Sequence, residues 1–296
     1  MPRFSWSTLF KNFNRQTFLV RRMATFPENL VTKDMYNCVS IDFTQDLKEP
    51  LTEETFQSNL DASEIQWKQQ GIRAIWCRIP LSLSHFIPIL VKDKFVYHHA
   101  KRQVAVMYKW ISDTETDNIP VYPYTNVGVS GLVIDSQDRA LVVQEKYTFK
   151  GGRFWKFPGG VADQGEEIGQ TVEREVFEET GIRTSFHSIL TMRHWHGFQF
   201  GCSDMFITCL MTVDESRPDA LKLSKCSHEI HDVAWIPVQE LIPQLTQSNR
   251  FCLEKYWFAK KSSVGITSHK VPFVLGGDIT VYSTNKINDN RDDKKE

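Results

Sequence analysis

One run, from Gly160 to Ile182, constrains the fold and the chemistry of this 296-residue chain more than any other segment. Its central part, residues 167–179, has the spacing of a helix that ends before Gly181, where a left-handed C-terminal cap favours glycine. The aliphatic residues of this part recur every four positions and predict the buried stripe of the helix: Ile168, Val172 and Val176. The run therefore predicts a loop, an amphipathic helix and a second loop.

Three glutamates of that helix are spaced three and four residues apart, namely Glu175, Glu178 and Glu179. Residues at this spacing are neighbours on a helix surface, so the carboxylates would repel one another unless a cation lay among them. Hard oxygen ligands favour Mg²⁺ or Mn²⁺, which also bind phosphate oxygens and acidify a coordinated water. We therefore predict that these three glutamates bind a divalent metal ion.

Two further charged residues of the run are expected to support this site. Arg174 directly precedes the cluster, and Glu166 lies at the junction between the loop and the helix. An ion pair between them would fix the loop against the helix and orient the carboxylates. The alternative interpretation of the run is an acidic, solvated helix that binds no ligand.

The spacing of the charged and glycine positions argues against that alternative. The run matches G-x5-E-x7-R-E-U-x-E-E-x-G-U at every defined position, where U is a bulky aliphatic residue, and so resembles the signature of Nudix hydrolases. The resemblance implies a Nudix α/β/α sandwich with a mixed sheet. It also implies five catalytic residues, of which the last two are supporting: Glu175, Glu178, Glu179, Arg174 and Glu166. Which glutamate is the general base stays open.

The resemblance covers residues 36–260 and is most similar to one group within that family. The segments that carry it include Trp155-Lys-Phe-Pro-Gly-Gly and Ser203-Asp-Met-Phe. This group contains plant ADP-ribose/NADH pyrophosphatases and the antisense basic fibroblast growth factor protein, or nucleoside diphosphate-linked moiety X motif six. The resemblance implies hydrolysis of ADP-ribose or NADH, a homodimer in many members, and an acetyltransferase-like α/β domain before the Nudix domain.

Charged residues near the run are candidate substrate contacts. Lys150, Arg153 and Lys156 precede it and could donate hydrogen bonds to substrate phosphates, or could be solvated surface charges. Glu229 precedes a predicted strand at a position where many Nudix proteins carry an acid. Asp204 is a weaker candidate, for which solvation at a strand edge is the alternative.

Aromatic residues near the run could stack on an adenine ring, although aromatic residues beside a sheet more often belong to the core. The candidates are Trp155, Phe157 and Trp195.

A polar, proline-containing stretch from Ser112 to Tyr124 divides the chain. Before it, the residue pattern predicts strands over 36–43 and 72–79, helices over 53–70 and 82–91, and a hairpin over 95–110. His98 and His99 in that hairpin are expected to point to opposite faces and to be structural.

The second half is predicted to begin with a hairpin of strands 127–134 and 140–145. The expected later elements are strands over 185–192, 205–213 and 232–237 and helices over 238–245 and 247–260. We therefore expect an N-terminal domain over 31–115, a Nudix domain over 120–262 and an extension over 263–296, with a disordered tail from Asn285.

The first residues are basic and contain no acid before Glu28. On a helix, Lys11, Arg15 and Arg22 would lie opposite Leu9, Phe13 and Val20. This pattern is typical of a mitochondrial targeting segment, which we place within residues 1–30. The alternatives are a disordered basic tail or a membrane-surface helix, either of which is compatible with a cytoplasmic protein.

Composition limits the remaining function classes. A net charge of −1 argues against a broad surface for polyanions, so nucleic acid is not an expected partner. No apolar run approaches the ~20 residues of a membrane span. The six cysteines form no CxxC pair and are expected to be free thiols.

These observations together predict a Nudix pyrophosphatase with a nucleotide substrate. We expect it to use Mg²⁺ or Mn²⁺ to hydrolyse the pyrophosphate bond of nucleoside diphosphate-linked compounds, namely ADP-ribose and NADH. The alternatives are a catalytically weak, nucleotide-binding regulatory protein and a Nudix enzyme that acts on capped RNA or coenzyme A.

Overall fold

The computed structural model describes residues 25–47, 49–147, 152–272 and 276–286, and the chain divides into two compact units, Met1–Pro123 and Tyr124–Glu296. Residues 1–24, which hold most of the predicted targeting segment, lie outside the described residues. Phe26 and Leu30 are buried in the core of the first unit, so removal of a segment that included them would open that core. None of the described helices has the length and hydropathy needed to cross a membrane.

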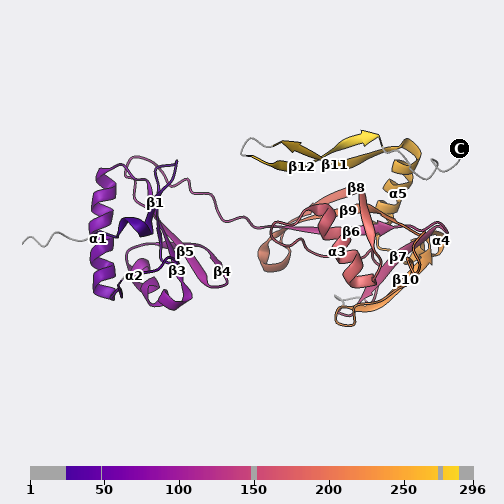
Figure 1. Ribbon diagram of the computed structural model, residues 1–296, viewed down its shortest axis with the longest axis horizontal. Coiled ribbons are helices and arrows are strands. Elements are labelled where there is room, and N and C mark those ends of the chain that lie inside the picture. The colour runs from indigo at the N-terminus through magenta and orange to yellow at the C-terminus, as the bar shows by residue number, and fades with distance from the viewer. Residues whose placement is uncertain (1–24, 48, 148–151, 273–275, 287–296) are drawn as a thin grey trace, which may run out of the picture. The chain divides into compact units, whose positions relative to one another are not determined.

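The first unit is a five-stranded sheet in the order β1-β2-β3-β5-β4, with helices packed on one face (Figure 1). Strands β2 and β3 are parallel, and the other neighbours are antiparallel. Its strands are β1 (Val31–Lys33), β2 (Val39–Asp42), β3 (Ala74–Pro80), β4 (Val96–Lys101) and β5 (Val104–Trp110). Its helices are α1 (Glu53–Gln69), α2 (Ile87–Lys92) and the short 3₁₀ segments Glu28–Leu30 and Leu81–Phe86.

Helix α1 begins where the sequence predicts it. The Thr52 side chain accepts a hydrogen bond from the Thr55 amide at 3.2 Å, which caps the first turn. Phe56, Leu60 and Trp67 lie on its buried side and pack on the sheet. The predicted helix over 82–91 is instead a 3₁₀ segment followed by α2, because a proline near the start of α2 cannot donate the amide that a continuous helix needs.

The face of this sheet opposite α1 is covered by the segment 112–122, which the sequence marks as a linker. The Trp110 indole donates to the Glu115 carbonyl at 2.8 Å, and the Tyr108 hydroxyl donates to Asp117 at 3.0 Å. The Tyr122 ring stacks on the His99 ring at a centroid separation of 4.4 Å. We name this segment the strap, because it lies along the sheet rather than extending freely between the units.

The expectation that His98 and His99 point to opposite faces is wrong. The pairing of β4 with β5 shifts register between Tyr97 and His99, so a β-bulge turns both rings to the same side. Their Nδ1 atoms lie 2.7 Å apart, and His98 Nε2 lies 2.9 Å from the Pro120 carbonyl oxygen. Both histidines are structural contacts of the strap.

The second unit has a five-stranded mixed sheet in the order β12-β11-β8-β9-β6 and a two-stranded sheet of β10 and β7 (Figure 1). β6 is parallel to β9, and the other pairs are antiparallel. The strands are β6 (Thr125–Val133), β7 (Arg139–Glu145), β8 (Thr184–Trp195), β9 (Ser203–Val213), β10 (Ile230–Pro237), β11 (Val264–Pro272) and β12 (Asp278–Lys286). The helices are α3 (Ile168–Thr180), α4 (Val238–Leu241) and α5 (Gln247–Ser262), with 3₁₀ segments Gln199–Gly201 and Ile242–Gln244.

Two separate cores make this unit a three-layer sandwich. Val172 and Val176 of α3 pack on one face of the five-stranded sheet, together with Val129 and Ile207. Leu253 of α5 belongs to a second cluster that fills the other face. The predicted α/β/α sandwich with a mixed sheet is therefore confirmed.

Two expectations about the strands of this unit are wrong. β6 and β7 do not form a hairpin: the turn between them carries the chain from one sheet to the other, and a single bridge, Ile134 with Ala140, joins them. The Asp135 carboxylate holds this turn by accepting from the Gln137 and Arg139 amides. The extension after α5 forms the hairpin β11–β12, so Asn285 and Lys286 are strand residues, and only 287–296 of the expected tail lie outside the described residues.

Candidate active site

The loop over 158–162 runs antiparallel to β6 and brings the start of the signature beside the sheet. The Val129 amide donates to the Gly160 carbonyl at 2.8 Å, and the Gly131 amide donates to the Pro158 carbonyl at 2.8 Å. A Cβ at Gly159 would lie 2.1 Å from the Val129 carbonyl oxygen, so a side chain at this position would force the loop away from β6. The glycines therefore allow the loop to approach the sheet closely.

Helix α3 then carries the signature carboxylates back towards this loop. The helix ends at Gly181, whose φ of 77° confirms the expected left-handed cap. Glu175 and Glu179 face the loop, whereas the Glu178 side chain is 56% exposed. The order of the sequence thus places the glycine loop directly against the glutamate side of the helix.

Arg174 connects the carboxylates of the signature. Its guanidinium donates to both oxygens of Glu166, at 2.8 and 2.9 Å, and to Glu175 at 2.8 Å and Glu178 at 3.2 Å. The hydrogen bonds from Arg174 lower the pKa of Glu166 to about 2. The predicted Glu166–Arg174 ion pair is therefore present and joins the loop to the helix.

Glu179 is buried between the helix and the loop. One of its carboxylate oxygens accepts a hydrogen bond from the Gly159 amide at 2.8 Å. Burial raises the pKa of Glu179 to about 7, with further contributions from the charges of Glu175 and Glu145, while Lys156 and the Gly159 amide lower it. Burial likewise raises the pKa of Glu175, assisted by the charges of Glu178 and Glu229.

A cation beside Glu175 and Glu179 would offset the cost of burying these carboxylates and the repulsion between them. All donors of the cluster are oxygens, which suits a hard divalent cation such as Mg²⁺ or Mn²⁺. Within the described residues, no three acidic, histidine or cysteine side chains converge on one point, because Arg174 draws Glu175 and Glu178 to itself. A bound cation would compete with Arg174 for these two carboxylates, so the three-glutamate ligand set stays a prediction.

A pH dependence of stability follows from Glu179 in the metal-free protein. The pKa of Glu179 is about 7 in the folded chain, against an ordinary value of 4.5 for a glutamate side chain. The folded chain therefore holds a proton that the unfolded chain releases, so the stabilisation is complete below pH 4.5 and is lost as the pH rises through 7. We expect the melting temperature in EDTA to fall between about pH 5 and about pH 8, and the decline to be smaller in Glu179→Gln. Equal slopes for the two proteins in calorimetry would contradict the assignment.

Gly160 provides a second test of the site. A Cβ at this position would lie 2.6 Å from the carboxylate atoms of Glu175, which would have to move. Gly160→Ala is therefore expected to lower kcat by about 100-fold. This is the larger of the losses usual when a residue that orients a metal ligand is changed. Gly152→Ala is the comparison: its φ of 106° strains the backbone of any residue with a side chain, but no atom lies within 4 Å of a Cβ there, so it reports backbone strain without a contact to Glu175. Steady-state kinetics of both variants measure the effect, and equal losses would show that the contact with Glu175 is not its cause.

The structure places two of the charged candidates for substrate binding, Lys156 and Glu229, near the glutamate cluster. Lys156, next to the loop, pairs with Glu145, and its charge lowers the pKa of Glu179. Glu229 lies in the turn before β10, where its charge raises the pKa of Glu175. Arg153 is exposed and forms no ion pair with any described residue. Lys150 lies outside the described residues.

Sequence reasoning missed Glu145, the last residue of β7. It pairs with Lys156, and its charge raises the pKa of Glu179. An acid two residues after the apolar run Ala140–Val143 was the available signal. It could not be connected with the signature before β7 was known to lie beside Lys156, which pairs with Val143.

The remaining candidates have different surroundings. Phe157 is buried in the core, and Trp155 packs against the same cluster, so both are structural. Trp195 is 52% exposed and lies outside the buried clusters. Asp204 is buried and approaches Arg193 at 3.6 Å, so the expectation of strand-edge solvation is wrong.

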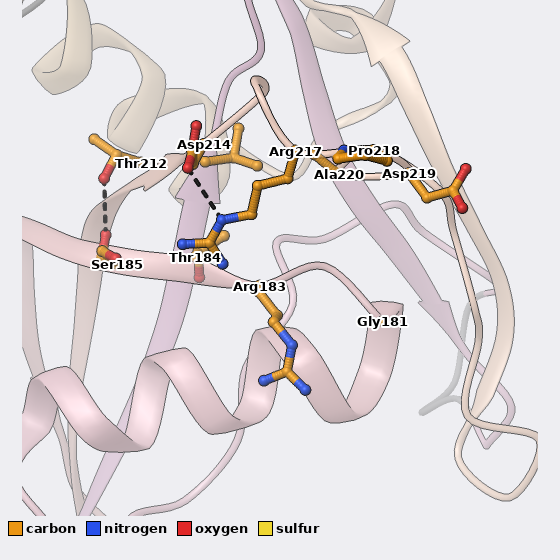
Figure 2. Close-up of a pocket in the computed structure, with 11 residues that line it drawn as sticks. Gly181, Arg183, Thr184, Ser185, Thr212, Asp214, Arg217, Pro218, Asp219 and Ala220 are labelled. Atoms are coloured by element: carbon orange, nitrogen blue, oxygen red, sulfur yellow. Dashed lines mark hydrogen bonds and ion pairs between the residues drawn. The ribbon is translucent and has the colours of Figure 1, made fainter.

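A cavity of about 670 Å³ lies away from these carboxylates, at the C-terminal end of α3 (Figure 2). Arg217 points to Asp214 across it, at 3.0 Å, and Arg183 extends towards α3, where its guanidinium lies 4.2 Å from the centre of the Phe177 ring. Both arginines are therefore already engaged. No residue of the signature other than Gly181 lines this cavity.

Comparison with known proteins identifies the family. A model of the NUDIX domain matches residues 124–256, and a model described as a Nudix hydrolase domain matches residues 30–111. Nudix hydrolase 2 of Arabidopsis thaliana is 35% identical over 213 residues, which cover 72% of this chain and 73% of that protein. The chain belongs to the Nudix hydrolase family. Nudix hydrolases generally use divalent metals such as Mg²⁺ or Mn²⁺.

Two further Nudix relatives are longer than the region that matches. Nucleoside diphosphate-linked moiety X motif 6 of Homo sapiens is 34% identical over 212 residues, which cover 70% of this chain and 65% of that protein. Nudix hydrolase 8 of Arabidopsis thaliana is also 34% identical over 212 residues, which cover 71% of this chain and 55% of that protein. The acetyltransferase-like description of the N-terminal unit stays a prediction, since the model that matches it is itself named for Nudix hydrolases.

Proposed function

We propose that this Nudix protein hydrolyses the pyrophosphate bond of nucleoside diphosphate-linked compounds, with ADP-ribose and NADH as its substrates and Mg²⁺ or Mn²⁺ as its metal. The observation that carries the proposal is the pair of carboxylates that lie against the glycine loop, the partly buried Glu175 beside Gly160 and the buried Glu179 on the Gly159 amide, both with raised pKa values. Such a site gains from binding a cation, and a cation binds phosphates. The name of the human relative, nucleoside diphosphate-linked moiety X motif 6, supports nucleoside diphosphate-linked compounds as the substrate class.

The chain's own residues have distinct roles in this proposal. Glu175, Glu178 and Glu179 would hold the cation, which would neutralise charge on the pyrophosphate. Arg174 and Glu166 fix the helix relative to the loop. Lys156 lies close enough to lower the pKa of Glu179 and could donate to a phosphate oxygen. A carboxylate of the cluster accepts the proton of the attacking water.

The test is cleavage of a panel of compounds by the full-length chain. ADP-ribose, NADH, coenzyme A, diadenosine polyphosphates and capped RNA are incubated with Mg²⁺, Mn²⁺ or EDTA, and products are resolved by chromatography. We expect ADP-ribose and NADH to be cleaved into two phosphate-bearing products only with metal. Cleavage of another compound instead would refute the substrate assignment. Nucleotide binding in calorimetry without any cleavage would favour the regulatory alternative.

We also propose that the basic N-terminal segment directs the protein to mitochondria. The support is its lack of acids before Glu28 and its basic and apolar sides. A reporter fused to residues 1–30 is expected to enter mitochondria, and a fusion with Lys11, Arg15 and Arg22 changed to glutamine is expected to remain in the cytoplasm. Equal distribution of the two fusions would contradict the proposal.

A homodimer is the proposed assembly, supported by the resemblance to the plant pyrophosphatases. Sedimentation of the full-length chain measures it directly. A monomer at micromolar concentration would refute this proposal without affecting the proposed reaction.

A further inference from the structure

The hairpin β11–β12 is attached to its own sheet by very little backbone pairing. Its two strands pair along their full length, from Val264 with Lys286 to Pro272 with Asp278. Only Ile266 with Ile189 connects the hairpin to β8 among the described residues. The position of the hairpin must therefore depend on side chains.

Those side chains contact the start of the signature helix. Lys270 and Thr280 are opposite each other in the hairpin, so they lie on one face. The Lys270 ammonium lies 3.2 Å from the Glu167 carboxylate, and the Thr280 hydroxyl donates to the same carboxylate oxygen. Glu167 is the N-terminal cap of α3 and is the neighbour of Glu166 in the chain.

A third residue on that face packs against the same turn. The Tyr282 ring lies edge-on to the Phe186 ring, with centroids 6.0 Å apart. Burial and the Glu167 charge raise the pKa of Tyr282, while the backbone of Gly169 and Ile168 lowers it, so the phenol lies against the first turn of α3. The Phe186 amide in turn donates to Glu173 of α3 at 2.8 Å.

We propose that the C-terminal hairpin is a positioning element of the active site, and that Lys270, Thr280 and Tyr282 act through Glu167 to hold the first turn of α3. This inference rests on the proposed hydrolase function. The chain of contacts runs from the hairpin to Glu167, through the adjacent Glu166 to Arg174, and from Arg174 to Glu175. The contacts of the three hairpin residues are with Glu167 and Phe186 rather than with the glutamate cluster, so we assign them as positioning residues.

The contacts differ in strength. Lys270 is 63% exposed and Glu167 37% exposed, so their ion pair is screened by water and contributes little. Thr280 and Tyr282 are partly buried, and their contacts are less accessible to solvent. Thr280 and Tyr282 are therefore the residues to change.

The test compares two double variants of full-length protein. Thr280→Val with Tyr282→Phe removes both hydroxyls but keeps the shape of the side chains. Ser283→Ala with Thr284→Val is the matched control, because these residues of the same strand are exposed and form no side-chain hydrogen bond with any described residue of α3. Cleavage of ADP-ribose with Mn²⁺ gives kcat and KM, and hydrogen exchange with mass spectrometry follows the backbone amides of 163–172.

We expect kcat of the first variant to fall by about 10-fold and its KM to change by less than about twofold. A tenfold loss is the smaller of those usual when a residue that orients a metal ligand is changed. Its 163–172 amides should exchange faster than those of the control, while the α5 amides exchange equally. Unchanged kcat and unchanged exchange would overturn the proposal, as would equal changes in the control.

Two further experiments cover the cases in which the double variant does not fold or the wild type does not cleave ADP-ribose. If the double variant does not fold, the single variants Thr280→Val and Tyr282→Phe are each compared with Thr284→Val. Faster exchange of the 163–172 amides in either single variant supports the proposal, whereas exchange equal to that of Thr284→Val in both overturns it. If the wild type does not cleave ADP-ribose, the proposed substrate is wrong. The exchange data then decide the role of the hairpin by themselves.

Discussion

Glu178→Gln is expected to lower kcat by about 1,000-fold and to leave the melting temperature within about 2 °C of the wild type. Loss of one ligand charge removes about 4 kcal/mol of transition-state stabilisation, which corresponds to that factor. The fold depends little on this side chain, which is 56% exposed and contacts Arg174 at 3.2 Å. Steady-state kinetics and a thermal melt measure the two effects.

The control is Glu254→Gln, which removes an exposed glutamate from α5 without touching the signature. Its kcat and melting temperature are expected to equal those of the wild type. A kcat for Glu178→Gln within about tenfold of the wild type would refute a role of the glutamate cluster in metal binding, since one lost ligand costs far more than that.

Arg174→Met is expected to combine loss of activity with loss of stability. It leaves Glu166 and Glu175 without their partner, and these side chains are only 15% and 14% exposed. Breaking a partly buried ion pair from one side costs about 3 kcal/mol of unfolding free energy, and we expect kcat to fall by about 100-fold. Arg174→Lys should recover little, because one ammonium cannot form the paired hydrogen bonds to Glu166.

The divalent cation gives this prediction a specific signature. Mg²⁺ or Mn²⁺ should restore part of the lost stability, because the cation offsets the repulsion that Arg174 normally relieves. Urea unfolding with and without metal measures the recovery. Arg217→Met is the control, because the Arg217 and Asp214 side chains of this ion pair are 66% and 54% exposed. We expect its free energy of unfolding to change by less than about 0.5 kcal/mol and not to depend on the metal. If the metal stabilised both variants equally, the cation would not be acting in place of Arg174, and this prediction would be wrong.

The sequence correctly predicted those features that depend on residues close together in the chain. The helix over 167–179 is α3, and the Glu166–Arg174 pair forms as expected, because spacing along one helix and one short loop determines both. The predicted helix over 53–70 is α1 for the same reason. The six cysteines are free thiols, as their scattered positions indicate.

Features that depend on contacts distant in the sequence were not predicted. Two predicted strands, 127–134 and 140–145, with a turn sequence between them are compatible with a hairpin, and only the partners β9 and β10 show that they belong to different sheets. Glu145 reaches the site only through that arrangement. The hairpin β11–β12 was missed because most of its residues are exposed and even its apolar residues, such as Val271, Ile279 and Val281, lie outside the buried core.

The strap determines where the chain should be truncated to obtain the first unit alone. A fragment that stopped at residue 111, where the family match ends, would expose the rings of Tyr108 and Trp110 and leave the His99 ring without Tyr122. Such a fragment would present an aromatic surface to solvent and would tend to self-associate. A fragment that continues to Pro123 keeps this surface covered by its own chain and is the one to choose for expressing the N-terminal unit alone.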